Sequence, residues 1–506
     1  MHIPEFEEII EPNDQTIARS EHLEKLRELV GNVYPNKFDR STLSGAEDTI
    51  SRVLKLGEVI AITSAMAAVR ADLKQGERPP AEIKDAFNAR LKALGTVRIA
   101  GRLTTPPRGN FVHLTDGMSK LQIYCDKKGG FGLIKNDGKG TVDPQGGWAA
   151  WQLIDHGDFV GAEGYLFVTN TGEVSVHVEK LQFLAKAMLP MPDKMHGIED
   201  PELKQRRRYV DLIGSSLAVE HEGMTTREVF ETRAKVISSA RNFLEENGYI
   251  EVETPMLTPK ATGAAAKPFK THHNALDIDL YARIAPELYL KRLVVGGFEK
   301  VYELNRNFRN EGISYKHNPE FTMLEFYCAY MDVEGMMNFC EELMRQSVQK
   351  ATGGLLVNYE GNEVDFSKFE RISMKDAIAK YAPNIEVDDN RIVTAFDEHV
   401  EHNLIQPTFI IDYPKSISPL SKASPANPNI AERFELFING MEVANGFSEL
   451  NDPKEQYERF VDQMAAREGG DEEAMVLDED YIRALSYGMP PAAGIGIGID
   501  RLVMLL

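Results

Sequence analysis

The stretch that decides the fold spans residues 308–327 and reads FRNEGISYKHNPEFTMLEFY. Apolar residues alternate with charged ones on both sides of a centre that contains a glycine, an asparagine and a proline. These three residue types favour turns, so the pattern predicts two antiparallel strands around a loop that carries Lys316 and His317.

Charged side chains are unusually dense in this stretch. Side chains two residues apart point to the same face of a strand, so we expect Arg309 to share a face with Glu311, and Glu325 with Tyr327. A buried charge is costly unless it is paired or bound to a ligand. The residues therefore indicate either a structural Arg–Glu network, or a site in which Arg and His bind a phosphate and Glu binds an ammonium group.

A second informative stretch, AGIGIGIDRLVMLL, spans residues 493–506. Its glycines at every second position leave one strand face without side chains, which favours a flat ligand close to the sheet or close packing against a helix. Asp500 is expected to cap the helix that follows, placing Arg501 in the first turn, where it could stack on a purine. The glycines are Gly494, Gly496 and Gly498.

A third stretch, RFELFINGMEVANGFSELND, spans residues 433–452. It predicts two successive strands that present the carboxylates of Glu435 and Glu442. Two carboxylates together with phosphate oxygens form a normal magnesium environment. Taken alone, either glutamate is equally well explained as an exposed strand residue.

Composition limits the class of protein. The chain has 506 residues, enough for two or three domains, and a net charge of −21, which argues against nucleic-acid binding by the molecule as a whole. The window 96–136 is the exception, with seven Lys or Arg residues against two acids, and indicates either a nucleic-acid surface or a solvated basic face. No apolar run is long enough to span a membrane, and the N-terminus lacks the pattern of a signal peptide. Three cysteines without zinc spacing predict a reduced, cytoplasmic location without disulfides.

Periodicity divides the chain into four segments. Residues 1–95 predict a helical N-terminal extension, and residues 96–185 contain five short alternating runs that predict a small closed barrel. Within the barrel, the glycine-rich segment 127–157 predicts an exposed and partly mobile loop. Residues 186–205 predict a linker, and residues 206–506 an α+β domain built on an antiparallel sheet.

These stretches resemble the motifs of class II aminoacyl-tRNA synthetases. Residues 308–327 resemble motif 2, residues 494–506 motif 3, and NFLEENGYIEVETPML (242–257) motif 1, the dimer-forming element. The similarity to the lysyl-tRNA synthetase branch covers nearly all of 96–506. Within it, three stretches match most clearly: 271–312, 409–422 and 445–452. The resemblance implies a class II catalytic domain flanked by helices and an OB-fold barrel that binds the anticodon.

The resemblance also implies roles for individual residues, with Arg309 and Arg501 in catalysis. The residues implied for ATP are Arg309, Asn310, Glu311, His317, Asn318, Phe321, Glu442, Val443, Gly498, Asp500 and Arg501. Those implied for lysine are Gly263, Glu287, Arg309, Glu325, Tyr327, Asn445 and Glu449. Magnesium would be held by Glu435 and Glu442. In the barrel, Phe111 would stack on an anticodon base and Gln122 would hydrogen-bond to a base edge.

The implied reaction is the activation of L-lysine by ATP to lysyl-adenylate, followed by transfer of lysine to the 3′ end of tRNA(Lys), in a homodimer. Three glutamates suit a dicationic amino acid, whereas an aspartate pocket would need an additional Lys or Arg. One alternative is a tRNA-independent lysine ligase that modifies a protein, which the barrel at 96–185 disfavours. Another is a non-catalytic tRNA-binding scaffold, which the presence of Arg309, Arg501 and the magnesium glutamates disfavours.

The chain departs from this family in three places. Residues 44–96 and 127–157 are longer than usual, and the chain stops at Leu506 where relatives continue to a Phe-Pro pair. The last helix is too short to be stable alone, so either it docks unaided or the chain is truncated.

Overall fold

The computed structural model describes residues 2–74, 77–107, 109–192, 200–215, 217–221, 223–264, 266–385, 391–470 and 474–506. These residues form two compact units, 1–227 and 228–506. Residues 193–199 of the expected linker lie outside the described ranges, and the domain boundaries expected from the sequence stay predictions. Among the described residues, no helix combines the length and apolarity needed to cross a membrane.

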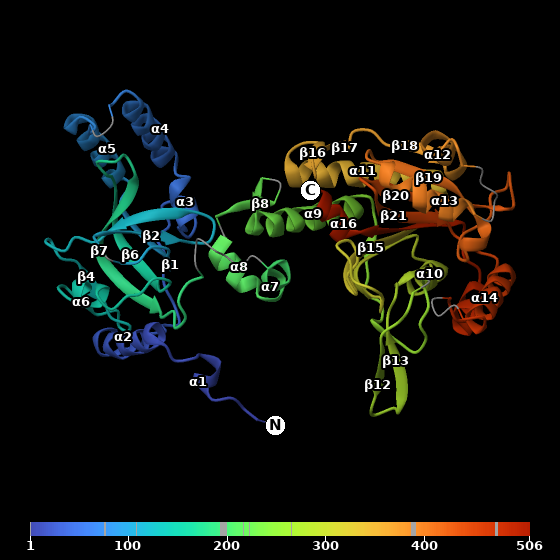
Figure 1. Ribbon diagram of the computed structural model, residues 1–506, viewed down its shortest axis with the longest axis horizontal. Helices are drawn as coiled ribbons and strands as arrows, with labels where there is room; N and C mark the ends of the chain where they lie inside the picture. The colour runs from blue at the N-terminus through green and yellow to red at the C-terminus, as the bar shows by residue number, and fades with distance from the viewer. Residues whose placement is uncertain are drawn as a thin grey trace. The chain divides into compact units, whose positions relative to one another are not determined.

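The first unit contains the predicted barrel (Figure 1). Strand β1 pairs with β2 and β6, β2 pairs with β3, and β6 pairs with β7, all antiparallel. A parallel pairing of β3 with β7 closes the ring, which gives an OB-like barrel. Its strands are β1 (Thr96–Leu103), β2 (Phe111–Thr115), β3 (Lys120–Tyr124), β6 (Phe159–Val168) and β7 (Val174–Ala185).

The N-terminal extension is helical, as predicted. Its helices are α1 (Phe6–Ile9), α2 (Asp14–Val30), α3 (Ile50–Leu54), α4 (Gly57–Ala71) and α5 (Ala81–Ala93). Asn13 begins α2 with a capping box, in which its side chain accepts from the Thr16 amide and the Thr16 side chain accepts from the Asn13 amide. Leu26, Ile62 and Leu91 are fully buried in the same apolar cluster as the barrel strands, so the helices complete the barrel core.

The prediction of an exposed, partly mobile loop at 127–157 is wrong. The segment forms β4 (Gly132–Ile134), β5 (Val142–Asp143) and α6 (Gly147–Trp151), and Leu133 and Trp151 are buried in the barrel core. A Cβ atom at Gly147 would lie 2.3 Å from Phe131. This glycine therefore permits close packing rather than mobility.

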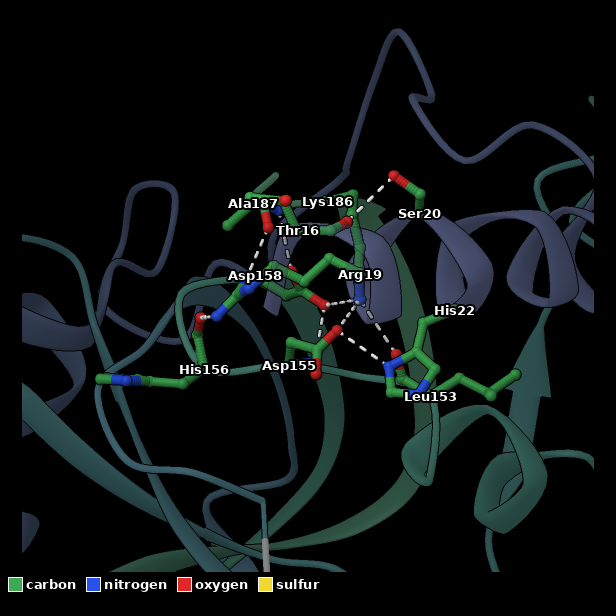
Figure 2. Close-up of polar contacts among 10 residues, drawn as sticks. All are labelled: Thr16, Arg19, Ser20, His22, Leu153, Asp155, His156, Asp158, Lys186 and Ala187. Carbon is green, nitrogen blue, oxygen red and sulfur yellow. Dashed lines mark hydrogen bonds and ion pairs between the residues drawn. The ribbon is translucent and has the colours of Figure 1, made fainter. Parts of the chain in front are cut away.

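A buried ion cluster lies beneath α2 (Figure 2). The Lys186 ammonium donates to Asp155 at 2.5 Å, to Asp158 at 2.9 Å and to the Leu153 carbonyl at 3.0 Å. Asp158 also accepts from the backbone amides of Asp155 and Ala187, both at 2.8 Å. All three protons of the ammonium therefore have acceptors within the barrel.

Helix α2 is tied to this cluster by two side chains (Figure 2). Arg19 donates to the backbone carbonyls of Ala187 at 2.7 Å and His156 at 3.0 Å. The Nδ1 atom of His22 lies 3.0 Å from the Asp155 carboxylate. These contacts attach the N-terminal helix to the end of β7. The first unit ends with α7 (Pro201–Arg206), α8 (Arg208–Ser215), β8 (Val219–His221) and β9 (Met224–Thr225).

The second unit is built on an eight-stranded sheet in the order β10-β14-β15-β22-β21-β20-β19-β18. Its pairs are antiparallel except β10–β14 and β18–β19, so the α+β prediction is confirmed. The strands are β10 (Ile250–Glu251), β14 (Lys300–Phe308), β15 (Glu320–Ala329), β18 (Glu370–Ser373), β19 (Thr408–Pro414), β20 (Ile430–Ile438), β21 (Met441–Ser448) and β22 (Ala492–Gly498).

Helices pack against both faces of this sheet (Figure 1). Apolar residues of α9 (Thr226–Glu246), α11 (Val333–Thr352) and α16 (Ile499–Leu505) share one buried cluster with β15, β20, β21 and β22. A second cluster joins α10 (Glu287–Val295), α14 (Pro453–Glu468) and α15 (Glu479–Leu485) to Tyr327 and Ala492 on the sheet. The remaining elements are β11 (Leu257–Thr258), β12 (Lys270–His273), β13 (Ile278–Ala282), β16 (Leu356–Tyr359), β17 (Asn362–Asp365), α12 (Met374–Tyr381), α13 (Ile392–His399), and the short 3₁₀ helices η1 (Glu401–Asn403) and η2 (Lys415–Ile417).

Strands β14 and β15 are the antiparallel pair predicted around the central loop, with Glu303 opposite Glu325. The prediction that Arg309 and Glu311 share a strand face is wrong, because β14 ends at Phe308. The Asn310 amide donates to the Lys267 carbonyl at 2.7 Å, which draws the chain away from the sheet. Glu311 therefore lies in the exposed loop.

The last helix, α16, docks on the core through buried Leu502 and Leu505. The prediction that Asp500 caps this helix is wrong, since the N-cap position is Gly498. The Asp500 carboxylate instead accepts from the Thr322 amide at 2.9 Å and pairs with Arg233 at 2.6 Å. These contacts join α16 to β15 and α9.

Candidate active site

A transverse row of paired residues forms the centre of the open sheet face. Glu325 on β15 pairs with Gly496 on β22, Gly496 with Asn445 on β21, and Asn445 with Glu435 on β20. Side chains at directly paired positions point to the same face. The register therefore places three polar side chains on one face, around a glycine that has none.

The glycines of β22 create room for neighbouring side chains of the site. A Cβ atom at Gly494 would lie 2.3 Å from the Tyr327 ring and 2.4 Å from the Glu449 carboxylate. At Gly496 it would lie 2.6 Å from the Met323 side chain. The alternative of close helix packing is wrong at these two positions, because the nearest atoms belong to β15 and to Glu449.

Three glutamates, Glu287, Glu325 and Glu449, lie close together near Tyr327 and Gly494. Glu325 is buried and accepts a hydrogen bond from the Tyr327 hydroxyl at 2.7 Å. Burial, together with the negative charge of Glu287, raises the pKa of Glu325 to about 8. Burial likewise raises the pKa of Glu449, and the charges of Glu287 and Glu325 add to that effect. The structure thus brings together three of the carboxylates expected at a lysine site.

Lys291 is a member of this cluster that the sequence interpretation missed. It lies one turn after Glu287 on α10, and its ammonium is 2.6 Å from Glu287 Oε1 and 2.5 Å from Glu449 Oε2. The side chain is completely buried. Its i,i+4 spacing from Glu287 is the sequence signal that could have identified the ion pair.

Several buried polar atoms around the cluster have no hydrogen-bond partner among the described residues. They include Oε1 of Glu449, Oδ1 of Asn445, Nε of Arg309 and the Tyr481 hydroxyl. Buried polar groups are nearly always hydrogen-bonded, so unpaired groups that surround one face indicate a ligand site.

Gly263 lies in a loop that precedes α10. Its φ of +100° favours glycine, and a Cβ atom there would lie 3.1 Å from the Ala285 carbonyl. A larger residue would push on the backbone shortly before Glu287.

The motif 2 side chains form the neighbouring part of the face. The Arg309 guanidinium lies 5.2 Å from the centroid of the Phe321 ring, and the Arg309 amide donates to the Pro319 carbonyl at 2.9 Å. Asn310 and Glu311 are exposed, and the Asn318 side chain donates to the Glu320 carbonyl at 2.9 Å. Arg309 is thus placed at the strand end with one side against an aromatic ring.

Arg501 joins motif 3 to the motif 2 loop. Its guanidinium donates to the Glu442 carbonyl at 2.6 Å and lies 3.2 Å from the Glu442 carboxylate. Burial lowers the pKa of His317, and the positive charge of Arg501 lowers it further. Val443 is buried beside Glu442, and Gly498 precedes the helix that carries Arg501. Asp500 is held by the contacts to β15 and α9 described above.

Glu435 and Glu442 are the residues expected to hold magnesium. Glu435 accepts from the Tyr413 hydroxyl at 2.9 Å and from Asn445 at 3.2 Å, and pairs with Arg433 at 2.5 Å. Burial raises the pKa of Glu435, and the charge of Glu442 adds to that shift, so the carboxylates are close enough to repel each other. Two such carboxylates fit a cation that phosphate oxygens also bind. The described residues contain no group of three or more His, Cys, Asp or Glu side chains that would hold a metal alone.

In the barrel, Phe111 and Gln122 lie near each other on β2 and β3. Phe111 is 46% exposed, and its ring centroid lies 4.6 Å from that of Tyr124. Gln122 donates to Glu173 at 3.0 Å and accepts from Ser175 at 2.9 Å. The exposed ring is available for stacking, which a core residue would not be.

The fold and the motif 2 and motif 3 geometry agree with a family comparison. Residues 200–506 match the family described as tRNA synthetases class II (D, K and N). The chain therefore belongs to this family.

Curated relatives narrow the comparison to the lysine group. A protein of Dichelobacter nodosus named lysine–tRNA ligase is 49% identical over 447 residues, which are 83% of this chain and 86% of that protein. One of Bordetella bronchiseptica with the same name is 48% identical over 444 residues, 81% of this chain and 84% of that protein. One of Coxiella burnetii, also so named, is 44% identical over 528 aligned residues, 99% of this chain and 95% of that protein.

Proposed function

We infer that this chain is an ATP-dependent lysine–tRNA ligase, which activates L-lysine as lysyl-adenylate and transfers it to the 3′ end of tRNA(Lys). The observation that carries the inference is the buried group of Glu287, Glu325 and Glu449, whose carboxylates act on one another. A pocket of this charge suits an amino acid with two ammonium groups, and Oε1 of Glu449, which has no partner among the described residues, marks one place where an ammonium would bind.

Different residues would contact different parts of the lysine substrate. In our proposal Glu287, Glu325 and Gly263 surround the α-ammonium, whereas Tyr327 and Glu449 meet the ε-ammonium. Asn445 orients the lysine carboxylate. Arg309 contacts both that carboxylate and the α-phosphate, because its planar guanidinium can make two parallel contacts.

ATP would lie over the motif 2 side of the face. Phe321 and Arg501 would contact the adenine or the outer phosphates, with His317, Asn318, Glu311 and Asn310 in the loop around them. Val443, Glu442, Gly498 and Asp500 would form the wall that α16 and β21 provide. The proposal is supported by the positive charge of Arg501 on α16, which acts on His317 in the loop and, after burial, lowers the pKa of that histidine.

The chemistry needs no covalent enzyme intermediate. A lysine carboxylate oxygen attacks the α-phosphorus, and the bond to the oxygen of the leaving pyrophosphate breaks. The terminal ribose hydroxyl of the tRNA then attacks the carbonyl carbon, loses its proton, and AMP leaves. Positioned charges on this face accelerate both steps. Magnesium, held by Glu435 and Glu442 when bound, would neutralise phosphate charge.

The partners and location follow as proposals of the same kind. Phe111 and Gln122 would contact the anticodon from the barrel. A homodimer is supported by exposed apolar residues in and after motif 1, among them Ile250, Met256 and Leu257. Light scattering at micromolar concentration should give twice the chain mass, and a monomer would contradict the dimer. Three free, buried cysteines fit a reducing cytoplasm.

The test of the function is ATP–pyrophosphate exchange with each amino acid, followed by charging of tRNA(Lys). Exchange that depends on lysine, together with charging, is the expected result. Exchange without charging would indicate a lysine ligase that modifies a protein. Absence of both would indicate a scaffold and overturn the proposal.

A further inference from the structure

Lys291 has no place in the roles assigned above, although it lies in the middle of the proposed lysine pocket. A buried ammonium near an expected cationic substrate is unfavourable at first sight, because like charges repel. Its contacts are specific: Glu287 Oε1 at 2.6 Å, Glu449 Oε2 at 2.5 Å and the Phe447 ring centroid at 5.2 Å.

The charge count of the pocket explains the position of this lysine. Glu287, Glu325 and Glu449, when ionised, carry three negative charges, and the Lys291 ammonium leaves two uncompensated. Lysine at neutral pH brings two ammonium groups, and its carboxylate faces Arg309. The resident ammonium therefore matches the pocket to a dication.

We propose that Lys291 is a specificity-determining positioning residue, which sets the charge of the lysine pocket by holding an ammonium group between Glu287 and Glu449. This inference rests on the proposed function and deepens it. Lys291 touches the glutamates and acts through them, since its ammonium is between Glu287 and Glu449 rather than on the open face.

The electrostatics of the neighbours agree with this role. The Lys291 charge lowers the pKa values of Glu325 and Glu449, whereas burial raises both. The other ionisable groups that act on the cluster are Glu303 and Tyr327 on the sheet and Tyr481 on α15. The pKa of Lys291 itself is raised by Glu287, Glu449 and Tyr481 against the opposing effect of burial, so the ammonium stays charged.

The test replaces Lys291 by methionine, which keeps the length of the side chain and removes its charge. In lysine-dependent pyrophosphate exchange at pH 7, Lys291→Met should raise the KM for lysine about tenfold or more, and the KM for ATP should stay within about twofold. The tenfold change corresponds to a rise of about one unit in the pKa of the pocket glutamates. The defect should shrink toward pH 9, because higher pH ionises the glutamates without help. Discrimination between lysine and norleucine, which lacks the ε-ammonium, should fall in parallel.

Two further variants separate this role from a structural one. Lys291→Arg keeps the positive charge. The pH at which its KM for lysine is half-changed should therefore equal that of the unmodified enzyme, even where the KM values themselves differ. A midpoint displaced upward by a full unit in Lys291→Arg would overturn the proposal, even if Lys291→Met does not fold. Lys186→Met removes a buried ammonium from the barrel and should leave the lysine KM unchanged.

The proposal would also be overturned by a Lys291→Met defect that is the same at pH 7 and pH 9. Equal increases in the KM values for lysine and ATP would overturn it as well. The proposed function fails separately, when the unmodified enzyme shows no lysine-dependent exchange.

Discussion

Lys186 in the barrel and Lys291 in the sheet domain are both fully buried side chains, and each faces two carboxylates. Around Lys186 every acceptor is matched, and backbone amides complete the shell of Asp158 (Figure 2). Around Lys291, Oε1 of Glu449 and the Tyr481 hydroxyl lack a hydrogen bond from any described residue. A completed cluster contributes to the stability of the fold, whereas an incomplete one is organised for a ligand.

Removal of Lys186 tests most directly whether its cluster stabilises the fold. Lys186→Met leaves two buried or half-buried carboxylates without their partner, which should cost about 3–5 kcal/mol of unfolding free energy. Denaturant unfolding followed by circular dichroism measures the loss. The matched control is Lys180→Met on β7, whose partly exposed pair with Glu163 should contribute about 1 kcal/mol or less. Equal losses in the two variants would contradict a structural role for the cluster.

Arg309 has the largest expected effect on the chemistry. A preorganised donor that contacts the attacked phosphate contributes about 10²–10³ in rate, so Arg309→Ala should slow adenylate formation by that factor and change lysine binding much less. Arg309→Lys should not restore the rate, because a point charge lacks the planar two-pronged contact. Single-turnover adenylate formation measures this effect.

Arg306→Ala provides the control for Arg309. Arg306 lies on β14, three residues before Arg309, but is exposed and pairs with Glu320 at 3.2 Å. We expect a near-normal rate for it. An Arg309→Ala variant with a normal melting curve and a near-normal rate would refute the assignment.

Phe111 tests the barrel face with a smaller effect. Loss of one stacked base costs about 1–3 kcal/mol, so Phe111→Ala should raise the KM for tRNA in the charging reaction. Pyrophosphate exchange, which does not need tRNA, should stay intact. Charging kinetics at varied tRNA concentration measure it. Equal damage to charging and exchange would mean that the ring stabilises the barrel instead.

The pH dependence of lysine binding has the smallest expected effect. The pKa of Glu325 is about 8, so this carboxyl is mostly protonated at pH 7 and ionises as the pH rises. The KM for lysine should therefore fall between pH 7 and pH 8.5, by at most about tenfold for a shift near one unit. Glu325→Gln should flatten that part of the profile. A KM that rises over this interval would contradict the sign.

The sequence predicted much of this fold, and its errors have physical causes. Alternation and turn residues predicted β14 and β15 correctly. The glycines of 127–157 suggested mobility, although Gly147 serves close packing against Phe131. Local capping rules assigned Asp500 to its helix, whereas tertiary partners hold its carboxylate.

The candidate site divides in the same way. The family resemblance predicted residues such as Glu325 and Glu449, which the sheet register and the loop after β21 bring together. The motifs did not reveal the ion pairs of Lys291, which contacts Glu449 beyond its own helix, or of Arg433, which pairs with Glu435 on the same strand. A buried counter-ion leaves little trace in sequence beyond its spacing to one neighbour.

The most direct test of the account measures protons released when lysine binds. Calorimetric titration at pH 7 in buffers of different ionisation enthalpy gives that number. If the ammonium groups of lysine meet carboxyls whose pKa values burial has raised, binding ionises those carboxyls, and net proton release is the predicted result. Norleucine should bind more weakly and release fewer protons. Lysine binding without proton release, or equal affinity for norleucine, would contradict the account.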